Sequence, residues 1–397
     1  MDFDDSPREA EFRAEARAWL EQHARLRTDA TEKITVLSGF DDSPEALTKA
    51  KEWQRLLAAD GWAAITWPAA LGGREAGPLE ALVWAEELNR FELPTNIFSI
   101  GIAMIGPTII AHGTPDQQSR YLKPMVEGRE VWCQLWSEPG AGSDLASLSS
   151  KAVRDGDHYV LTGQKVWTSG AHYCDFGLGL FRSDPSAPKH HGITALIVDM
   201  RSPGIDIRPL RQITGDAHFN EVFFDEVRVP VENRVGDEHE GWRVGRTTMM
   251  NERFAAGAMG AALGPYRALA HLATETGAAA DPRTRQALAR VYTLSLLFDL
   301  TTARVRTSLA RGMIPGVEGS ILKLFASQVG TALTETGCEL LGPAGVLTGG
   351  DGPEAGRWPA ALLGSIAMHI GGGTDEIQRN IIGEVVLGLP REPAVTQ

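Results

Sequence analysis

The spacing of apolar residues changes twice along this chain of 397 residues, and that change limits the possible folds more than any other feature. Before Val131 and after Gly241, apolar side chains recur at the spacing that places them on one face of a helix. Between these regions, residues 131 to 230 contain short apolar runs separated by turn residues, the pattern of strands. Because no helical pattern alternates with these strands, they predict an antiparallel β unit and not a βαβ array.

Particular residues mark where several elements begin or turn. Residues 6 to 9 form a capping box with proline at the first helical position, and Ser43 begins a second helix that Gly61 ends. Asp155-Gly156 joins two strand-like runs as a hairpin. Further helical runs cover about residues 78 to 91, 97 to 112, 115 to 127, 241 to 276, 282 to 311, 316 to 341 and 353 to 386.

Together these signals predict an α+β protein. We expect an all-α domain over residues 1 to 128, an antiparallel, barrel-like β domain over residues 129 to 238, and a helical bundle over residues 239 to 397.

The composition is that of a globular protein, with 43% hydrophobic and 22% charged residues. A net charge of −13 without a basic stripe argues against nucleic acid as a partner. Cys133, Cys174 and Cys338 are far apart, which argues against disulfides and a zinc site and fits a reducing cytoplasm. The acidic N-terminus is not a signal peptide, and no apolar stretch is long enough to span a membrane. We therefore predict a cytoplasmic protein.

Two familiar kinds of site do not fit the sequence. The glycines at 140 to 145 lack the third glycine of a dinucleotide fingerprint, and those at 350 to 355 follow no strand, which excludes a Rossmann site. His172, His190 and His191 lie near predicted loops without an acidic residue at ligand spacing. We interpret these histidines as solvated loop residues and predict no metal site.

The stretch from Trp132 to Ser169 carries the strongest functional signal. Residues 132 to 144 read Trp-Cys-Gln-Leu-Trp-Ser-Glu-Pro-Gly-Ala-Gly-Ser-Asp, and residues 163 to 169 read Gly-Gln-Lys-Val-Trp-Thr-Ser. Backbone amides of a glycine loop can approach a flat polar ligand closely, and an indole can cover one face of it. This pairing predicts a bound aromatic cofactor.

These segments resemble the acyl-CoA dehydrogenase family of flavoproteins. Further matches follow in the family's order over nearly the whole chain, at residues 61 to 62, 67 to 68, 71 to 73, 224 to 230, 251 to 253 and 372 to 380. The resemblance implies the family's fold, FAD as cofactor and an oxidoreductase of fatty acid or steroid metabolism. It also implies an acyl-CoA substrate and electron transfer to an electron-transferring flavoprotein.

The resemblance assigns roles to particular positions. In the family, FAD lies between the β domain and the bundle, and Ser137 keeps a hydroxyl where most members have threonine. The positions that match cofactor contacts are Gln134, Leu135, Trp136, Ser137, Gly142, Ser143, Trp167, Thr168, Ser169, Glu339, Gly342, Thr374 and Glu376. Glu339 and Gly342 belong to the loop that reaches a neighbouring subunit's FAD. The positions expected at the substrate are Ser143, Arg253, Gly372 and Gly373.

Oxidation of a thioester needs a carboxylate at the weakly acidic Cα–H. Most of the family has this glutamate in Tyr-Glu-Gly-Thr, where this chain reads Gly-Gly-Gly-Thr, so Gly372 occupies the base position. The isovaleryl-CoA and long-chain branches carry the base on a bundle helix before an arginine, which matches Glu252 and Arg253. Apolar neighbours predict that this helix is largely buried, and burial would raise the pKa of Glu252 toward the working range. We therefore predict Glu252 as the catalytic base.

One departure from the family concerns its Arg-x-x-Phe-Gly motif, whose arginine holds the FAD diphosphate of a neighbour. Residues 265 to 286 contain no Phe-Gly. With the Gly-Gly-Gly-Thr segment, this resembles actinobacterial branches, some of which act on steroid side chains as α2β2 assemblies. The expected assembly is a homo-oligomer, dimer or tetramer, or a hetero-tetramer with a related subunit.

The resemblance implies FAD-dependent α,β-dehydrogenation of the acyl-CoA to a 2-enoyl-CoA, and the same residues leave two alternatives. In the first alternative, the chain is a non-catalytic or half-site subunit of a hetero-oligomer. In the second, it is a relative with other flavin oxidation chemistry, such as nitroalkane oxidation. Nitroalkane oxidation uses an aspartate base, so Glu252 disfavours it. The sequence does not predict the length or ring structure of the acyl group.

Overall fold

A computed structural model describes residues 5–28, 34, 41–257, 263–311 and 318–391, with the backbone alone at 253–257 and 310. Packing divides the chain into two compact units. The sheet unit comprises Phe40–Ala76 and Pro94–Ala255, and the bundle unit comprises Met1–Gly39, Gly77–Leu93 and Ala256–Gln397. The three predicted domain boundaries stay a prediction.

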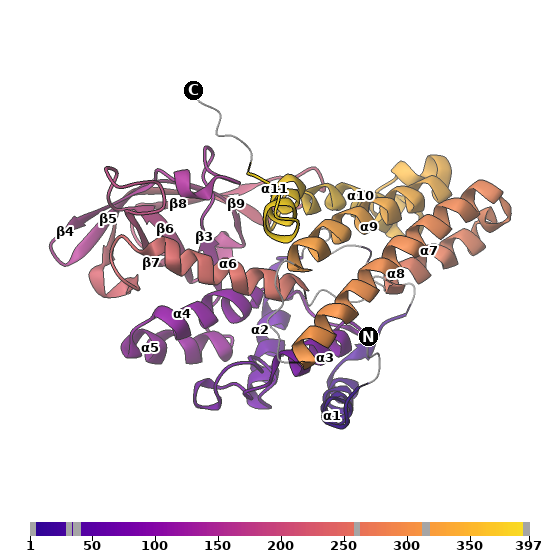
Figure 1. The fold of residues 1–397 in the computed structure, drawn as a ribbon, viewed down its shortest axis with the longest axis horizontal. Helices are drawn as coiled ribbons and strands as arrows, with labels where there is room; N and C mark the ends of the chain where they lie inside the picture. Colours follow the sequence, from indigo (N-terminus) through magenta and orange to yellow (C-terminus); the bar gives the residue numbers. More distant parts are fainter. Residues whose placement is uncertain (1–4, 29–33, 35–40, 258–262, 312–317, 392–397) are drawn as a thin grey trace. The chain divides into compact units, whose positions relative to one another are not determined.

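The sheet unit is built on one eight-stranded sheet (Figure 1). The strands are β3 (Trp132–Leu135), β4 (Lys151–Asp155), β5 (His158–Ser169), β6 (Phe176–Arg182), β7 (Ile193–Asp199), β8 (Ile205–Leu210), β9 (Phe219–Pro230) and β10 (Arg234–Val235). Their order is β10-β7-β6-β4-β5-β9-β8, with β3 beside β6. The predicted hairpin is confirmed, because Asp155 pairs with His158.

The α+β class is confirmed, but the barrel-like and wholly antiparallel form of the β domain is wrong. The sheet is open, with β8 and β10 at the ends of its strand order. Strand β3 runs parallel to β6, from Trp132 opposite Phe176 to Leu135 opposite Gly179. A parallel pair needs a long crossover connection. The loop after β3 and the β4–β5 hairpin provide that crossover, which a reading of each short strand alone misses.

Helices cover the sheet, and strand alternation divides its side chains between two cores. Trp132 contributes to a core shared with the helices, whereas its neighbour Cys133 points into the core formed largely by β5, β7 and β9. The helical elements of this unit include α2 (Pro44–Ala59), the π-helix η3 (Gly101–Ile105), α4 (Gly106–His112), α5 (Pro115–Val126) and α6 (Gly241–Gly257). The helix predicted over residues 97 to 112 therefore begins later and contains a π-helical turn.

The bundle unit joins N-terminal and C-terminal helices (Figure 1). Its elements include α1 (Pro7–His23), β1 (Arg25–Leu26), α3 (Pro78–Leu88), β2 (Phe91–Glu92), α7 (Leu263–Glu275), α8 (Pro282–Ala310), α9 (Glu318–Leu341), α10 (Arg357–Met368), α11 (Asp375–Ile381) and the π-helix η11 (Ile382–Val386). The predicted capping box at Ser6 and Glu9 is confirmed. Helices α9 and α10 pack so closely that a Cβ at Gly337 would lie 2.0 Å from Trp358.

The helical run predicted over residues 353 to 386 is wrong as one helix. It is divided between α10, α11 and η11, with a loop at residues 369 to 374. Gly372 and Gly373 have φ values of +67° and +88°, which belong to the left-handed region and end a helix. Among the described residues, no helix has an apolar stretch that is long enough to cross a membrane.

Candidate functional site

The loop after β3 holds the first group of predicted cofactor residues. Gln134 and Leu135 end β3, and Trp136 and Ser137 follow at its exit. Backbone bonds between Glu138 and Ala141, of 3.1 and 3.0 Å, then close a tight turn. The glycines at 140 and 142 are exposed, and a Cβ at either would meet no atom within 4 Å. The space beside this backbone is therefore open to a ligand.

A buried ion pair between Lys165 and Glu138 holds this turn in place. Lys165, on β5, has no solvent exposure, and its Nζ donates to Glu138 Oε1 at 2.8 Å. The same ammonium donates to the carbonyls of Trp136, at 3.1 Å, and Leu180, at 2.7 Å. Burial lowers the pKa of Lys165 to about 8, and the charge of Glu138 opposes that shift. Lys165 thus fastens the loop to β6.

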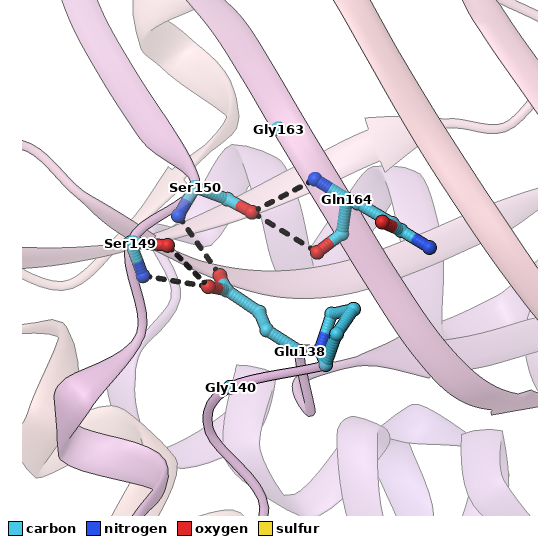
Figure 2. A pocket seen from close by; sticks show the side chains of 7 residues that line it. Glu138, Gly140, Ser149, Ser150, Gly163 and Gln164 are labelled. Carbon is cyan, nitrogen blue, oxygen red and sulfur yellow. Dashed lines mark hydrogen bonds between the residues drawn. The ribbon is translucent and has the colours of Figure 1, made fainter.

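Glu138 also binds the far end of the same loop (Figure 2). Its Oε2 accepts from Ser149 N at 2.6 Å, and its Oε1 accepts from Ser150 N at 2.9 Å. Burial raises the pKa of Glu138, but the charge and hydrogen bond of Lys165 outweigh it and keep the pKa below its usual range. Both ends of the segment 138–150 are therefore tied to one carboxylate. Glu138 and Lys165 lie inside the predicted cofactor motifs, but neither was among the predicted site residues.

A pocket of about 280 Å³ lies beside this turn (Figure 2). It is lined by Glu138, Pro139, Gly140, Ser149, Ser150, Gly163 and Gln164. Its polar side chains already have partners: Ser150 Oγ bonds the backbone of Gln164, whose side chain donates to Glu221 at 2.7 Å. None of the predicted site residues lines this pocket, and its lining residues belong to the anchored loop and to β5.

The second predicted segment ends β5 with an irregular, exposed tryptophan. The β5–β9 pairing shifts register between Lys165 and Thr168, and Trp167 has a φ of +60°. A bulky residue in this region is strained by about 1–3 kcal/mol, and such strain clusters at functional sites. The bulge leaves Trp167 59% exposed, with its ring 5.9 Å from that of Phe219. An apolar ring is therefore presented outward.

These residues fit a flat, partly polar cofactor such as a flavin. The exposed indole offers an apolar surface, and the open glycine loop offers backbone amides. Among the described residues, Trp136 Nε1 and Thr168 Oγ1 are buried without a hydrogen-bond partner. A bound ligand or water commonly relieves such atoms. Ser169 ends β5 half-buried, and Ser143 is exposed. Within the described part of the chain, no cluster of His, Cys, Asp and Glu could hold a metal ion.

Helix α6 carries the predicted base, and polar contacts fix its orientation. Thr248 Oγ1 lies 2.9 Å from Thr108 Oγ1 on α4, and both residues are fully buried. His112 Nε2 lies 2.7 Å from Thr247 Oγ1, and burial lowers the pKa of His112.

The position of Glu252 follows from these contacts. Asn251 Nδ2 donates at 3.4 Å to the carbonyl of Met104 in the π-helix, an element often found at functional sites. Residues four apart share a helix face, so half-buried Glu252 lies on the same face of α6 as Thr248. One face of the described part of α6 is buried, including Val244 and Thr248, whereas Met250 is 62% exposed. The predicted burial of residues 254 to 259 lies outside the described side chains and stays a prediction. The side chain of Arg253 lies outside the described residues, and its role stays a prediction.

The remaining predicted residues belong to the bundle unit. Gly372, at the sequence position of the family's usual base, is exposed and has no side chain that could take a proton. Thr374 caps α11, accepting from Ile377 N at 3.2 Å, and exposed Glu376 pairs with Arg379. Exposed Glu339 lies near the end of α9, which Gly342 follows. The predicted residues therefore form two sets, one in each unit.

Comparisons with known proteins agree with this fold and these motifs. Models of the N-terminal, middle and C-terminal domains of acyl-CoA dehydrogenases match residues 6–129, 133–227 and 239–387. The chain belongs to the acyl-CoA dehydrogenase family of oxidoreductases, whose members depend on a flavin.

The chain is similar to several known members of that family. It is 39% identical to the acyl-CoA dehydrogenase IpdE1 of Mycobacterium tuberculosis, over 96% of this chain and 98% of that protein. Among solved structures, it matches the Tcur3481–Tcur3483 steroid ACAD with a TM-score of 0.84 and 29% identity, covering 99% of this chain and 100% of that one. The ChsE4–ChsE5 complex of Mycobacterium tuberculosis matches with a TM-score of 0.81, 29% identity and the same coverage.

Proposed function

We propose that the chain oxidises an acyl-CoA thioester between Cα and Cβ, giving a 2-enoyl-CoA, with FAD as the cofactor. Glu252 takes the α-proton onto its carboxylate. When bound, the flavin would supply the two-electron acceptor for the hydride that leaves Cβ. The observation that carries this proposal is the fixed orientation of α6: Thr248 and Asn251 bind α4 and the π-helix and define the face on which Glu252 lies.

The two sets of residues have different tasks in this proposal. The loop from Gln134 to Ser143, anchored by Lys165, would hold the polar edge of the FAD, and Trp167 to Ser169 would form its wall. Thr374 and Glu376 would contact the same cofactor, whereas Glu339 and Gly342 would reach that of a neighbouring subunit. Ser143, Arg253, Gly372 and Gly373 would line the acyl-CoA.

We also infer a hetero-tetramer with a related subunit, with electrons passing to an electron-transferring flavoprotein. Two observations support this assembly over a homo-oligomer. Residues 265 to 286 lack the Arg-x-x-Phe-Gly motif, and the two similar structures carry paired subunit names, Tcur3481–Tcur3483 and ChsE4–ChsE5. The first of these structures is that of a steroid ACAD, which supports a steroid-like acyl group as the substrate of this chain.

The test is anaerobic mixing of the flavin-loaded protein with acyl-CoAs, from short-chain to steroid-like, while the flavin absorbance is followed. We expect steroid-like thioesters to bleach the flavin. Glu252→Gln should retain FAD and reduce it at least a hundredfold more slowly, since general base catalysis contributes about 10²–10⁴-fold. Glu52→Gln, an exposed substitution on α2, should match the parent. Reduction of Glu252→Gln at the parent rate would show that the base is another residue.

Purification of the chain alone tests its self-sufficiency. A yellow protein that is bleached by acyl-CoA would establish a complete site in one kind of chain. A colourless protein that gains flavin only with a related subunit would establish a half-site.

A further inference from the structure

A buried carboxylate lies in the bundle unit, at the first residue of α11. Asp375 is 4% exposed and accepts hydrogen bonds on both oxygens. Lys323 Nζ donates to Oδ1 at 2.8 Å, Ser327 Oγ donates to the same oxygen at 2.9 Å, and His369 Nδ1 lies 2.7 Å from Oδ2. Burial raises the pKa of Asp375, but the bonds from Lys323, His369 and Ser327 outweigh it and keep the pKa below its usual range. Asp375 therefore binds α9 and the end of α10 at once.

Helix α9 presents the partners of this cluster at regular intervals. Lys323, Ser327 and Thr331 are four residues apart, so they lie along one face of the helix. Thr331 Oγ1 lies 2.7 Å from His369 Nε2, on the opposite side of the ring from Asp375. If the ionised carboxylate accepts from Nδ1–H, then Nε2 accepts from the threonine hydroxyl. Both ring nitrogens of His369 are thus held in place.

The cluster closes a loop of the backbone. Two bonds join Asp375 and His369. The backbone N of Asp375 donates to the carbonyl of His369 at 3.0 Å, in addition to the contact between their side chains. Between these two residues, Gly372 and Gly373 have positive φ values. Buried Gln378 donates from Nε2 to the carbonyl of Gly372 at 2.9 Å. Glycines lose more conformational freedom on ordering than any other residue, so this segment needs such external bonds to hold one conformation.

We propose that Asp375 and His369 are positioning residues that hold the Gly371–Thr374 backbone in the geometry required by the acyl-CoA site. The inference rests on the proposed function, in which Gly372 and Gly373 line the substrate and Thr374 lies at the cofactor. Neither Asp375 nor His369 takes part in proton transfer. A site with glycine at the usual base position has no side chain to fix this segment, so the fixing groups lie at its two ends.

The experiment measures acyl-CoA reduction of the flavin in the holoenzyme, with its partner subunit if one is required, for Asp375→Asn, His369→Ala and His369→Asn. We expect the limiting reduction rate to fall by about tenfold to a hundredfold in Asp375→Asn and His369→Ala, because small misplacements near the reacting atoms have effects of this size. In His369→Asn, an amide N–H can replace Nδ1–H, so this variant should recover most of the lost rate. The exposed substitution Asp351→Asn serves as the control.

The double variant Asp375→Asn/His369→Ala should be no slower than its slower parent, since the two residues act as one unit. Variants that keep their FAD and are reduced at the parent rate would overturn the inference. So would a defect of equal size in His369→Asn and His369→Ala, because a purely structural histidine gains nothing from an asparagine amide. If Asp375→Asn fails to fold, the two His369 variants decide.

Backbone hydrogen exchange over residues 369–378 separates this inference from the proposed function. If no acyl-CoA reduces the flavin of the parent, the proposed function is wrong. The part of the inference by which Asp375 and His369 hold the Gly371–Thr374 segment is then still supported if the parent protects these amides and Asp375→Asn exchanges them at least tenfold faster. Unchanged exchange in Asp375→Asn would overturn it.

Discussion

Each compact unit contains a glycine loop tied to a buried carboxylate and a lysine, but the two anchors differ in their access to water. In the sheet unit, the side chains of Lys165 and Glu138 are 0% and 5% exposed. In the bundle unit, those of Lys323 and Asp375 are 15% and 6% exposed, and His369 is 38% exposed. A buried charge that loses its partner cannot be rehydrated. The glycine loop of the sheet unit is therefore held by an ion pair that water does not reach, whereas the anchor of the bundle loop is partly open to water.

The largest loss of stability is expected when the lysine of the sheet-unit anchor, Lys165, is replaced. Lys165→Met removes the cation and leaves the Glu138 carboxylate buried, so the free energy of unfolding should fall by about 3–5 kcal/mol. Chemical denaturation followed by far-UV circular dichroism measures this loss. Lys151→Met, at an exposed position of β4, is the matched control. A loss below about 1 kcal/mol would show that Glu138 is stabilised well enough by the serine donors.

The equivalent change in the bundle unit should have a smaller effect. In Lys323→Met, Asp375 keeps the bonds from Ser327 and His369, so we expect unfolding to become easier by about 1–3 kcal/mol. The same denaturation experiment gives the ratio of the two losses. An equal or larger loss at Lys323 would remove the distinction between the two anchors.

The sequence predicts the two loops but not their anchors. The glycines of 140–142 and 371–373 and the aromatic at 167 follow from local residue types, which act through the backbone beside them. Lys165 on β5 pairs with Glu138 in the loop after β3. Asp375 on α11 pairs with Lys323 on α9. These contacts are set by packing, which no local pattern contains. The spacing of Lys323, Ser327 and Thr331 at intervals of four indicates a polar face on α9. It does not indicate which residue this face contacts.

The same limit explains the errors in the fold. The apolar runs of the β domain correctly predict strands. The β3–β6 pairing joins residues some forty positions apart, so the strand patterns alone do not show that this pair is parallel. No proline lies near the break in the last helical run, since Pro359 is in the first turn of α10, and only the consecutive glycines before Thr374 indicate the break.

A third prediction separates stability from cofactor binding in the sheet unit. Glycine adopts the φ of Trp167 without strain, so Trp167→Gly should leave the unfolding free energy of the flavin-free protein unchanged or raise it by about 1 kcal/mol. Loss of the indole should weaken FAD binding by about tenfold, by removing roughly 1–1.5 kcal/mol of aromatic contact. Thermal unfolding and flavin fluorescence titration measure the two effects. Weaker stability with unchanged FAD affinity would assign Trp167 to packing alone.

The smallest effect is expected on the pH dependence of the unfolding free energy. It tests whether the anchor of the bundle loop depends on the ionised carboxylate of Asp375. The folded protein holds the pKa of Asp375 below its ordinary value of 3.8, so the unfolded chain takes up this proton first as the pH falls. The stabilisation is therefore complete above pH 3.8 and is lost as the pH falls through the lower folded pKa. In Asp375→Asn, the unfolding free energy should depend less steeply on pH below about 4 than in the parent. Denaturation midpoints at a series of acid pH values measure the slopes, and identical slopes would mean that Asp375 contributes its bonds to His369 and Lys323 without its charge.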